Sequence, residues 1–316
     1  MTTRIAAGLA TALVACAANA ADIAHHSLPE GFAYPEGIAV EKDGSAFYTP
    51  SAEDGTLIRV DLASGEARTI AAGGVLTASD APFPGLLGLK LDDQGRLWIA
   101  GGRTGSMLLV GTKDGGVVEK LQSTRQSSLI NDVALAGGYA YFTDSLNPEL
   151  WRVPVKEKVT APEKWIDFTG SPIQYTEGVN LNGIAATREG KALIVVQMNN
   201  GRLFRIDTAT KKIDPIDAGG AALSGGDGLV VDGNTLYVVR QTEDEIVALE
   251  LSRDQRTAKE VGRFKDAALM YPATAAKAGD KLLVVNTQFN RKGSKDPQLP
   301  FEIVGIPLAT LKEASR

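Results

Sequence analysis

Four side chains that carry oxygen donors stand at equivalent points of a repeated strand pattern: Glu36, Asn131, Asn182 and Asp227. Two are carboxylates and two are amides, and hard divalent cations prefer such oxygen ligands. Zinc and copper sites usually recruit imidazole or thiolate as well. Both histidines of the chain, His25 and His26, precede the first repeat. These residues predict one bound cation, with Ca²⁺ expected first and Mg²⁺, Mn²⁺ or Zn²⁺ as alternatives.

The repeat that positions these side chains recurs six times. Each copy has an apolar strand, a Gly-containing turn, a strand rich in aromatic or β-branched residues, a polar turn and a third apolar strand. The residues that enter the first strands are Glu36, Leu87, Asn131, Asn182, Asp227 and Ala273, with separations of 51, 44, 51, 45 and 46 residues. This spacing is typical of one propeller blade per repeat.

We therefore predict an all-β, six-bladed β-propeller over residues 21–316, with a central metal-binding channel. Residues near His26 to Leu28 are expected to complete the last blade. Because the first strand of every blade lines the channel, entry residues from distant repeats approach one another. Each polar pair, taken alone, is an ordinary turn dipeptide. Their coincidence at one register of four repeats favours a shared site.

The N-terminus has the pattern of a secretion signal. Met1 to Arg4 is basic, residues 5–15 form an apolar run too short to span a bilayer, and Ala18-Asn19-Ala20 is a small-residue cleavage site. We expect residues 1–20 to be a signal peptide and the mature protein to be periplasmic or secreted, without a transmembrane segment. Acylation of Cys16 as a lipoprotein is the alternative. Cys16 is the only cysteine, so a disulfide is excluded.

Charge and architecture limit the partners. The 316 residues carry a formal net charge of -5, and no stripe of Lys and Arg follows any segment. Nucleic acid is therefore not an expected partner. A closed propeller protects its strand edges, so a monomer is expected.

At these same positions the chain resembles the senescence marker protein / gluconolactonase family of six-bladed propellers, which is related to the paraoxonases and to diisopropyl fluorophosphatase. The matching motifs are Pro35-Glu36-Gly37, Asn131-Asp132, Asn182-Gly183-Ile184 and Asp227-Gly228-Leu229. The resemblance implies that the matching Glu, Asn, Asn and Asp bind one catalytic divalent cation. It also implies hydrolysis of a lactone or an organophosphate ester.

The sequence departs from that family at two points. Gluconolactonases often have an arginine two residues before the third-blade Asn, where this chain has Leu129, which argues against a sugar lactone. Paraoxonases use a histidine pair, whereas the blades here contain no histidine. The base must then be a carboxylate or a metal-bound hydroxide. Asp132 is the candidate general base, with a turn or supporting role equally open, and Asp227 is the candidate base or nucleophile.

The substrate pocket is predicted from strand direction. If the first strand starts at the metal end, the turn between the second and third strands lies at that end too, and these turns frame the entrance. Polar contacts to substrate are expected from Arg103, Gln197 and Arg240. Leu129 and Tyr175 are expected to form an apolar wall, although core packing explains them equally well.

Taken together, these features predict a metal-dependent hydrolase of the lactonase or esterase type, acting on a moderately hydrophobic small-molecule ester or lactone. The alternative is a non-enzymatic propeller that binds a ligand or protein and holds a structural calcium ion. A strictosidine-synthase-like condensing propeller is a third possibility. The complete Glu, Asn, Asn and Asp set argues against it.

Overall fold

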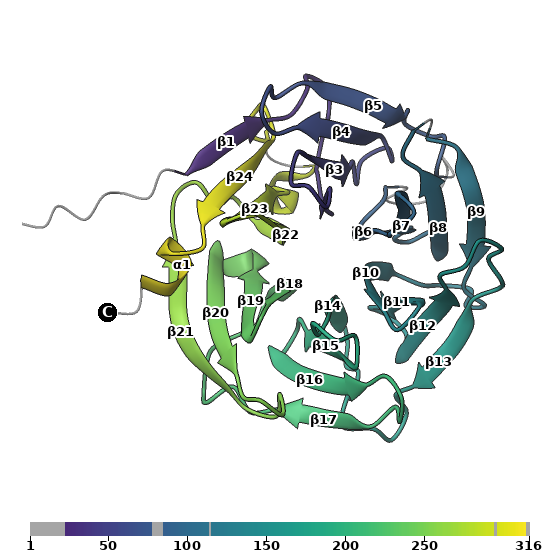
Figure 1. Cartoon of the computed structure of the whole chain (residues 1–316), viewed down its shortest axis with the longest axis vertical. Coiled ribbons are helices and arrows are strands. Elements are labelled where there is room, and N and C mark those ends of the chain that lie inside the picture. The colour runs from purple at the N-terminus through teal and green to yellow at the C-terminus, as the bar shows by residue number, and fades with distance from the viewer. Residues whose placement is uncertain (1–22, 78–84, 114, 294–295, 314–316) are drawn as a thin grey trace, which may run out of the picture.

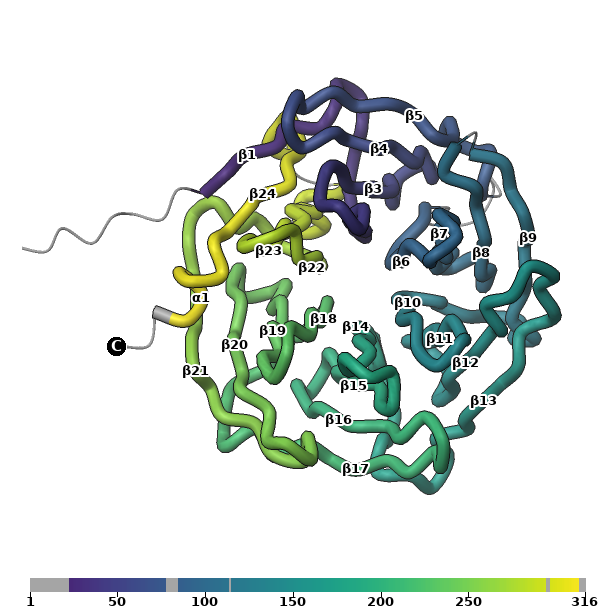
Figure 2. Tube along the Cα trace, viewed as in Figure 1, coloured from purple at the N-terminus to yellow at the C-terminus, as the bar shows by residue number. Residues whose placement is uncertain are grey.

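The computed structural model describes residues 23–77, 85–113, 115–293 and 296–313. Six antiparallel sheets of four strands each are arranged around a central axis, as Figure 1 shows. The chain runs through the blades in order around the ring, which the trace in Figure 2 makes easy to follow. The predicted fold class, an all-β six-bladed propeller, is confirmed.

The strands occupy four concentric positions. The innermost are β2 (Ala39–Val40), β6 (Leu89–Leu91), β10 (Ile130–Ala136), β14 (Leu181–Ala186), β18 (Gly226–Asp232) and β22 (Pro272–Ala278). The second are β3 (Ala46–Pro50), β7 (Arg96–Ala100), β11 (Tyr139–Asp144), β15 (Ala192–Gln197), β19 (Thr235–Arg240) and β23 (Lys281–Asn286). The third are β4 (Leu57–Asp61), β8 (Ser106–Gly111), β12 (Glu149–Pro154), β16 (Arg202–Asp207), β20 (Glu245–Leu251) and β24 (Glu302–Pro307). The outermost are β5 (Ala67–Ala71), β9 (Val117–Gln122), β13 (Glu163–Asp167), β17 (Ile213–Ile216), β21 (Ala258–Lys265) and β1 (Ala24–Ser27).

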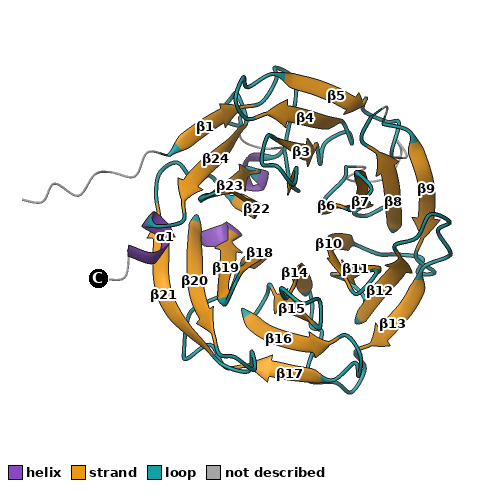
Figure 3. Cartoon of the chain, in the orientation of Figure 1, coloured by secondary structure: helices purple, strands orange, loops and turns teal. Residues whose placement is uncertain are grey.

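Helical structure is sparse in the described part of the chain, as Figure 3 shows. It consists of two 3₁₀ turns, η1 (Gln241–Glu243) and η2 (Phe289–Arg291), and one short helix, α1 (Thr310–Glu313). Within the described ranges, none of the helical segments has the length and apolar character needed to cross a bilayer. The predicted signal peptide and Cys16 lie outside the described residues.

The hydrophobic core is divided among the interfaces between neighbouring blades. One cluster joins blades 3 and 4 through residues such as Tyr141, Leu193 and Phe204, and another joins blades 4 and 5 through Ile194 and Leu236. Each strand alternates its side chains between two faces, and both faces of a blade are covered by its neighbours. Packing therefore holds the blades together sideways and leaves the axis for a channel.

The ring closes through its termini. Strand β1 pairs antiparallel with β24, with His25 opposite Val304 and His26 opposite Ile303. The N-terminal strand thus becomes the outer strand of the blade built from the C-terminal residues, close to the predicted segment. His25 Nδ1 also lies 2.9 Å from Glu302 Oε2 across the two strands. This seam removes the last open edge of the ring.

Candidate functional site

One end of the channel contains a pocket of about 250 Å³. The four predicted ligands all line it: Glu36, Asn131, Asn182 and Asp227. They come from four different blades and span almost two hundred residues of sequence, yet each lies at the start of an inner strand or, for Glu36, three residues before it. The ring geometry therefore brings the predicted residues to one cavity.

Backbone bulges set the direction of these side chains. The pairing of the first and second strands shifts register between Ile130 and Val133, and again between Leu181 and Ile184. The same shift occurs between Gly226 and Leu229 in the fifth blade. A bulge inserts an extra residue and re-aims its side chain. Asn131, Asn182 and Asp227 each lie inside such a shift.

The glycines that follow the candidate ligands are needed for close packing of the inner strands. A Cβ on Gly37 would lie 2.4 Å from the carbonyl oxygen of Leu87, and one on Gly183 would lie 2.1 Å from that of Asp227. Neither glycine has a positive φ, unlike Gly44 and Gly190 in the hairpin turns. Glycine is therefore required at Gly37 and Gly183 by the close approach of neighbouring inner strands, and not by the positive φ of a turn.

Glu36 is buried and incompletely satisfied. Its side-chain atom Oε2 is buried and has no hydrogen-bond partner among the described residues. Burial raises the pKa of Glu36 well above its ordinary value, and the nearby Asp227 and Asp132 carboxylates raise it further. A buried acceptor without a donor is costly unless something else pairs with it. This oxygen is the strongest local indication of a missing partner.

Asp227 is held by its neighbours inside the same pocket. Gln241 Nε2 donates a hydrogen bond of 2.6 Å to Asp227 Oδ2. Burial raises the pKa of Asp227 well above its usual range, and the Asp132 charge adds to the rise, while a hydrogen bond from Asn182 lowers it. Two buried acids therefore face one cavity, and each is destabilised in its charged form.

The two amides have their nitrogens engaged. Asn131 Nδ2 donates to Ser145 Oγ at 2.9 Å, and that hydroxyl donates in turn to the carbonyl oxygen of Leu181 at 2.6 Å. Asn182 Nδ2 lies 3.4 Å from Met198 Sδ. With the nitrogens used in this way, the amide oxygens are the atoms left to bind a ligand.

These donors fit a hard divalent cation. The set supplies carboxylate and amide oxygens only, and Glu36 Oε2 lacks any other partner. Among the described residues, no group of three or more His, Cys, Asp and Glu side chains is placed to hold a metal. Any ion here would therefore depend on Asn131 and Asn182 as well as on the two acids.

Asp132, the candidate general base, is not among the residues that line the pocket. Its Oδ1 accepts a hydrogen bond of 2.8 Å from the Val133 amide, and its Oδ2 accepts one of 3.0 Å from the Ile184 amide. The carboxylate thus links the inner strands of blades 3 and 4. Burial raises its pKa, and the Lys90 charge and these two N–H donors oppose the rise. This placement favours the supporting role over the role of base.

The predicted substrate residues divide into two groups. Arg103 and Leu129 line the pocket. Gln197 is turned away from it, because its Nε2 donates to Gln174 O and Asn180 Oδ1 at 2.8 and 3.1 Å. Arg240 donates to Ser224 O and pairs with Glu245. Tyr175 donates from its hydroxyl to Asp144 O at 2.6 Å. These last three do not line the pocket.

Alternation along the strand explains two of these corrections. Gln197 and Arg240 are the last residues of β15 and β19, and the next residue of each chain segment, Met198 and Gln241, faces the pocket. Successive side chains point to opposite sides of an extended strand, so a step of one residue exchanges inside for outside. Gln197 and Arg240 therefore each lie one residue before a residue that lines the pocket.

Sequence reasoning gave no role to several lining residues. They are Ala52, Gly85, Gly102, Val179, Met198 and Phe289. Ala52, Gly102, Met198 and Phe289 all follow second strands of their blades, as Gln241 also does. The signal that could have found them is their place within the first few residues after the second strand of each repeat.

Comparisons with known proteins support the fold alone. No protein-family model matches the chain, and no curated sequence is significantly similar to it. The solved structure of the allergen Mala s 1 of Malassezia sympodialis has a TM-score of 0.66 at 14% identity, covering 90% of this chain and 96% of that chain. Virginiamycin B lyase from Staphylococcus aureus gives 0.59 at 12% identity, covering 90% and 99%. U3-55K gives 0.61 at 12% identity, covering 91% and 98%. Such identities show a shared propeller architecture and leave the function open.

Proposed function

We propose that this protein is a metal-dependent hydrolase that opens a lactone or a related ester in the channel pocket. The observation that carries the proposal is the buried, unpartnered Glu36 Oε2, which lies in the same cavity as Asp227, Asn131 and Asn182. Four oxygen-bearing side chains at equivalent blade positions suit one hard cation, with Ca²⁺ as the first choice. The resemblance to the gluconolactonase-like propellers supports the same reaction class.

The division of roles follows from the contacts. Glu36, Asn131, Asn182 and Asp227 would hold the ion, and a bound divalent cation would polarise the ester carbonyl and lower the pKa of water. Ser145 fixes the amide of Asn131, and Gln241 fixes the carboxylate of Asp227. These hydrogen bonds keep the donors oriented before any ligand arrives, which favours catalysis by preorganisation.

Asp227 is the better candidate for proton transfer. Asp132 is occupied by two backbone N–H donors and does not line the pocket, whereas Asp227 does. A carboxylate that faces the cavity can accept a proton from a water molecule held there. In the proposed step a water oxygen attacks the ester carbonyl carbon and its proton passes to Asp227. The ring C–O bond then breaks, and the departing oxygen takes that proton to give a hydroxy acid.

The apolar side of the pocket matches the proposed substrate class. Leu87, Leu129, Val179, Met198 and Phe289 line the cavity and are each only partly buried. Together with the absence of an arginine at position 129, this lining supports a moderately hydrophobic ester or lactone rather than a sugar derivative.

A second candidate function has its own supporting observation. The carboxylate of Asp132 links two blades, and the only acids among the described residues that line the pocket are the expected ligands Glu36 and Asp227. A propeller in which a calcium ion only braces the channel, and whose open end binds a ligand or protein, would need no separate base. The two functions differ in whether an ester is turned over.

A pH-indicator assay of lactone opening separates them. We expect activity in the untreated protein, loss of activity with a chelator, and recovery on addition of Ca²⁺ or Mn²⁺. Asn182→Ala and Asp227→Ala should each lack activity because each removes an expected ligand. If both variants fold and hydrolyse lactones at the normal rate, the proposed site is wrong. Calcium binding without any turnover would support the brace instead.

A further inference from the structure

Among the described residues that line the pocket, one side chain is cationic, and it has no acidic partner. Arg103 lines the pocket and is exposed to solvent. Its side chain makes no ion pair or hydrogen bond with another described residue. Several other basic side chains near the entrance have carboxylate partners: Lys292 pairs with Glu53, Arg125 with Glu149, and Arg240 with Glu245.

The backbone that carries Arg103 is fixed next to the candidate site. Gly102 N donates to Ile130 O at 2.9 Å, and Ile130 N donates to Gly102 O at 3.1 Å. Ile130 directly precedes the expected ligand Asn131. The turn is closed further by Gly105 N, which donates to Gly102 O at 3.1 Å. Arg103 therefore extends from a rigid turn, and its position relative to Asn131 is set by the fold.

The charge balance of the pocket leaves Arg103 uncompensated. In the described part of the chain, the charged residues that line the cavity are Glu36, Asp227 and Arg103. A divalent cation at the candidate site would neutralise the two acids. The guanidinium of Arg103 is then the excess charge among the described residues that line the pocket. Guanidinium groups bind carboxylate and phosphate through paired N–H donors.

We infer that the substrate carries an anionic group, a carboxylate or a phosphate, which Arg103 binds at the mouth while the ester lies deeper among Leu129, Val179 and Phe289. This specificity for an anionic, otherwise hydrophobic lactone rests on the proposed function. The separation of charge at the mouth from apolar lining within sets the orientation of the substrate. The ester then enters first, toward Asp227, and the anion stays outside.

Two γ-lactones of equal length test the inference, one with a side chain ending in a carboxylate and the other ending in a primary amide. We expect kcat/KM to favour the carboxylate by about fivefold, the scale of an exposed ion pair. Arg103→Gln should bring the ratio to about one, and Arg103→Glu should reverse it. Arg188→Gln removes an exposed arginine at the opposite end of the channel and should leave the ratio unchanged. Added salt should weaken the preference.

A binding measurement separates failure of this inference from failure of the proposed function. The matching lactams, which resist hydrolysis, are titrated calorimetrically into the wild type and Arg103→Gln. Preferential binding of the carboxylate lactam that requires Arg103 supports the inference even if no lactone is opened. Equal affinity for both lactams, or a preference that survives Arg103→Gln, overturns it even if hydrolysis is observed.

Discussion

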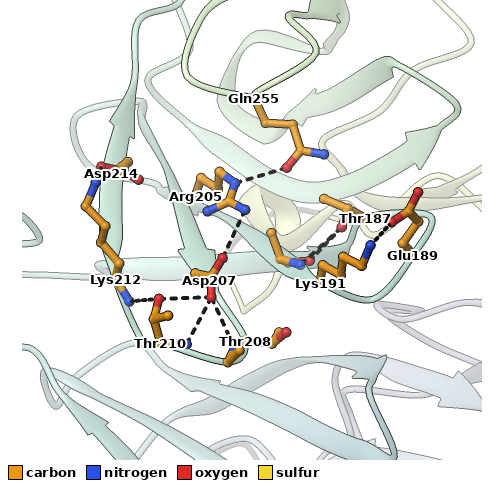
Figure 4. A network of polar contacts seen from close by, with 12 residues as sticks. Thr187, Glu189, Lys191, Arg205, Asp207, Thr208, Thr210, Lys212, Asp214 and Gln255 are labelled. Carbon is orange, nitrogen blue, oxygen red and sulfur yellow. Dashed lines mark hydrogen bonds and ion pairs between the residues drawn. The ribbon is translucent and has the colours of Figure 1, made fainter.

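Two aspartates of this propeller, Asp207 and Asp227, lie in surroundings that shift their pKa values in opposite directions. Asp207 ends β16 in an outer turn, where its Oδ1 accepts from the Thr210 amide and hydroxyl at 2.9 Å each, as Figure 4 shows. Arg205 approaches its other oxygen at 3.2 Å. These donors, the Thr210 amide first, hold the pKa of Asp207 at about 2. The turn satisfies its carboxylate completely from its own residues.

Asp227 lies in the buried channel pocket, where Gln241 donates to one of its oxygens and no cationic side chain pairs with it among the described residues. Its pKa is raised by burial and by the Asp132 charge, and the neighbouring Glu36 has an oxygen without any partner. A carboxylate that serves stability is surrounded by donors, as at Asp207. A carboxylate that is buried, lies near another negative charge and borders a cavity instead indicates a binding site. This contrast is the basis for placing the cation in the channel.

The largest expected effect comes from replacing each of the two aspartates, Asp227 and Asp207, by asparagine. Asp227→Asn should lower lactonase activity by at least roughly 100-fold, because it removes an expected ligand and the candidate base. In chelator it should unfold at no lower temperature than the wild type, since it removes a buried charge. Asp207→Asn should keep full activity and lose about 1 kcal/mol of stability. Assays and thermal unfolding of both variants check this. The contrast fails if Asp207→Asn is the inactive one.

Crowding at the axis gives the next largest effect. Gly183→Ala places a Cβ 2.1 Å from the carbonyl oxygen of Asp227, so the inner strands of blades 4 and 5 must separate. We expect a loss of about 3 kcal/mol, as in overpacked cores, together with weaker cation binding. Gly305→Ala is the matched control, because its nearest neighbour is a side-chain carbon at 3.2 Å. Equal stability of the two variants in denaturant unfolding would show that the axis is not tightly packed.

The two buried acids in the channel, Glu36 and Asp227, predict an unusual dependence of stability on pH. The folded-state pKa values of Glu36 and Asp227 are raised, so above about pH 4 the unfolded chain releases protons that the folded chain keeps. In chelator, the free energy of unfolding should therefore fall as pH rises from about 4 toward the folded-state pKa values. With Ca²⁺ present the fall should diminish, since the ion binds the ionised acids. Denaturant unfolding across pH measures both. A rise with pH in chelator would contradict the burial of these acids.

The smallest expected effect concerns His26, in the strand β1 that closes the ring against β24. Burial, with the charges of Lys281 and His25, lowers the pKa of His26. The folded state therefore disfavours the protonated ring, and stability should be complete above about pH 6.5 and decrease as pH falls below it. Because His26 is partly exposed to solvent, the loss should be less than about 1 kcal/mol. His26→Gln should remove this part of the pH dependence in thermal unfolding. An unchanged profile would show that the seam does not sense protonation.

The architecture was predictable because it repeats. Six copies of one strand pattern at separations of 44 to 51 residues require a ring, and the equivalence of entry positions brings Glu36 and Asp227 into one pocket. Closure by the N-terminal strand was also predictable, because the last repeat lacked an outer strand of its own. Each of these inferences uses the average pattern of a repeat.

The direction in which each individual side chain points was not predictable from the same repeat pattern. At the bulge between Ile130 and Val133, Asn131 faces the pocket and Asp132 links two blades. The residue types alone do not indicate which of the two side chains faces the pocket. Likewise, Met198 faces the cavity where Gln197 was expected. Because side chains alternate between the two faces of a strand, an error of one residue places a side chain on the wrong face. The fold follows from periodicity, whereas the site depends on where the periodicity is broken.

Calorimetric titration of the chelator-treated protein with Ca²⁺ tests the central claim most directly. We predict one site per chain and release of protons on binding, because Glu36 and Asp227 are protonated more readily than ordinary acids when the ion is removed. Binding should be lost in Asp227→Asn and unchanged in Asp207→Asn. Absence of binding to Ca²⁺, Mg²⁺ and Mn²⁺, or binding that persists unaltered in Asp227→Asn, would contradict the assignment of the channel pocket as a cation site.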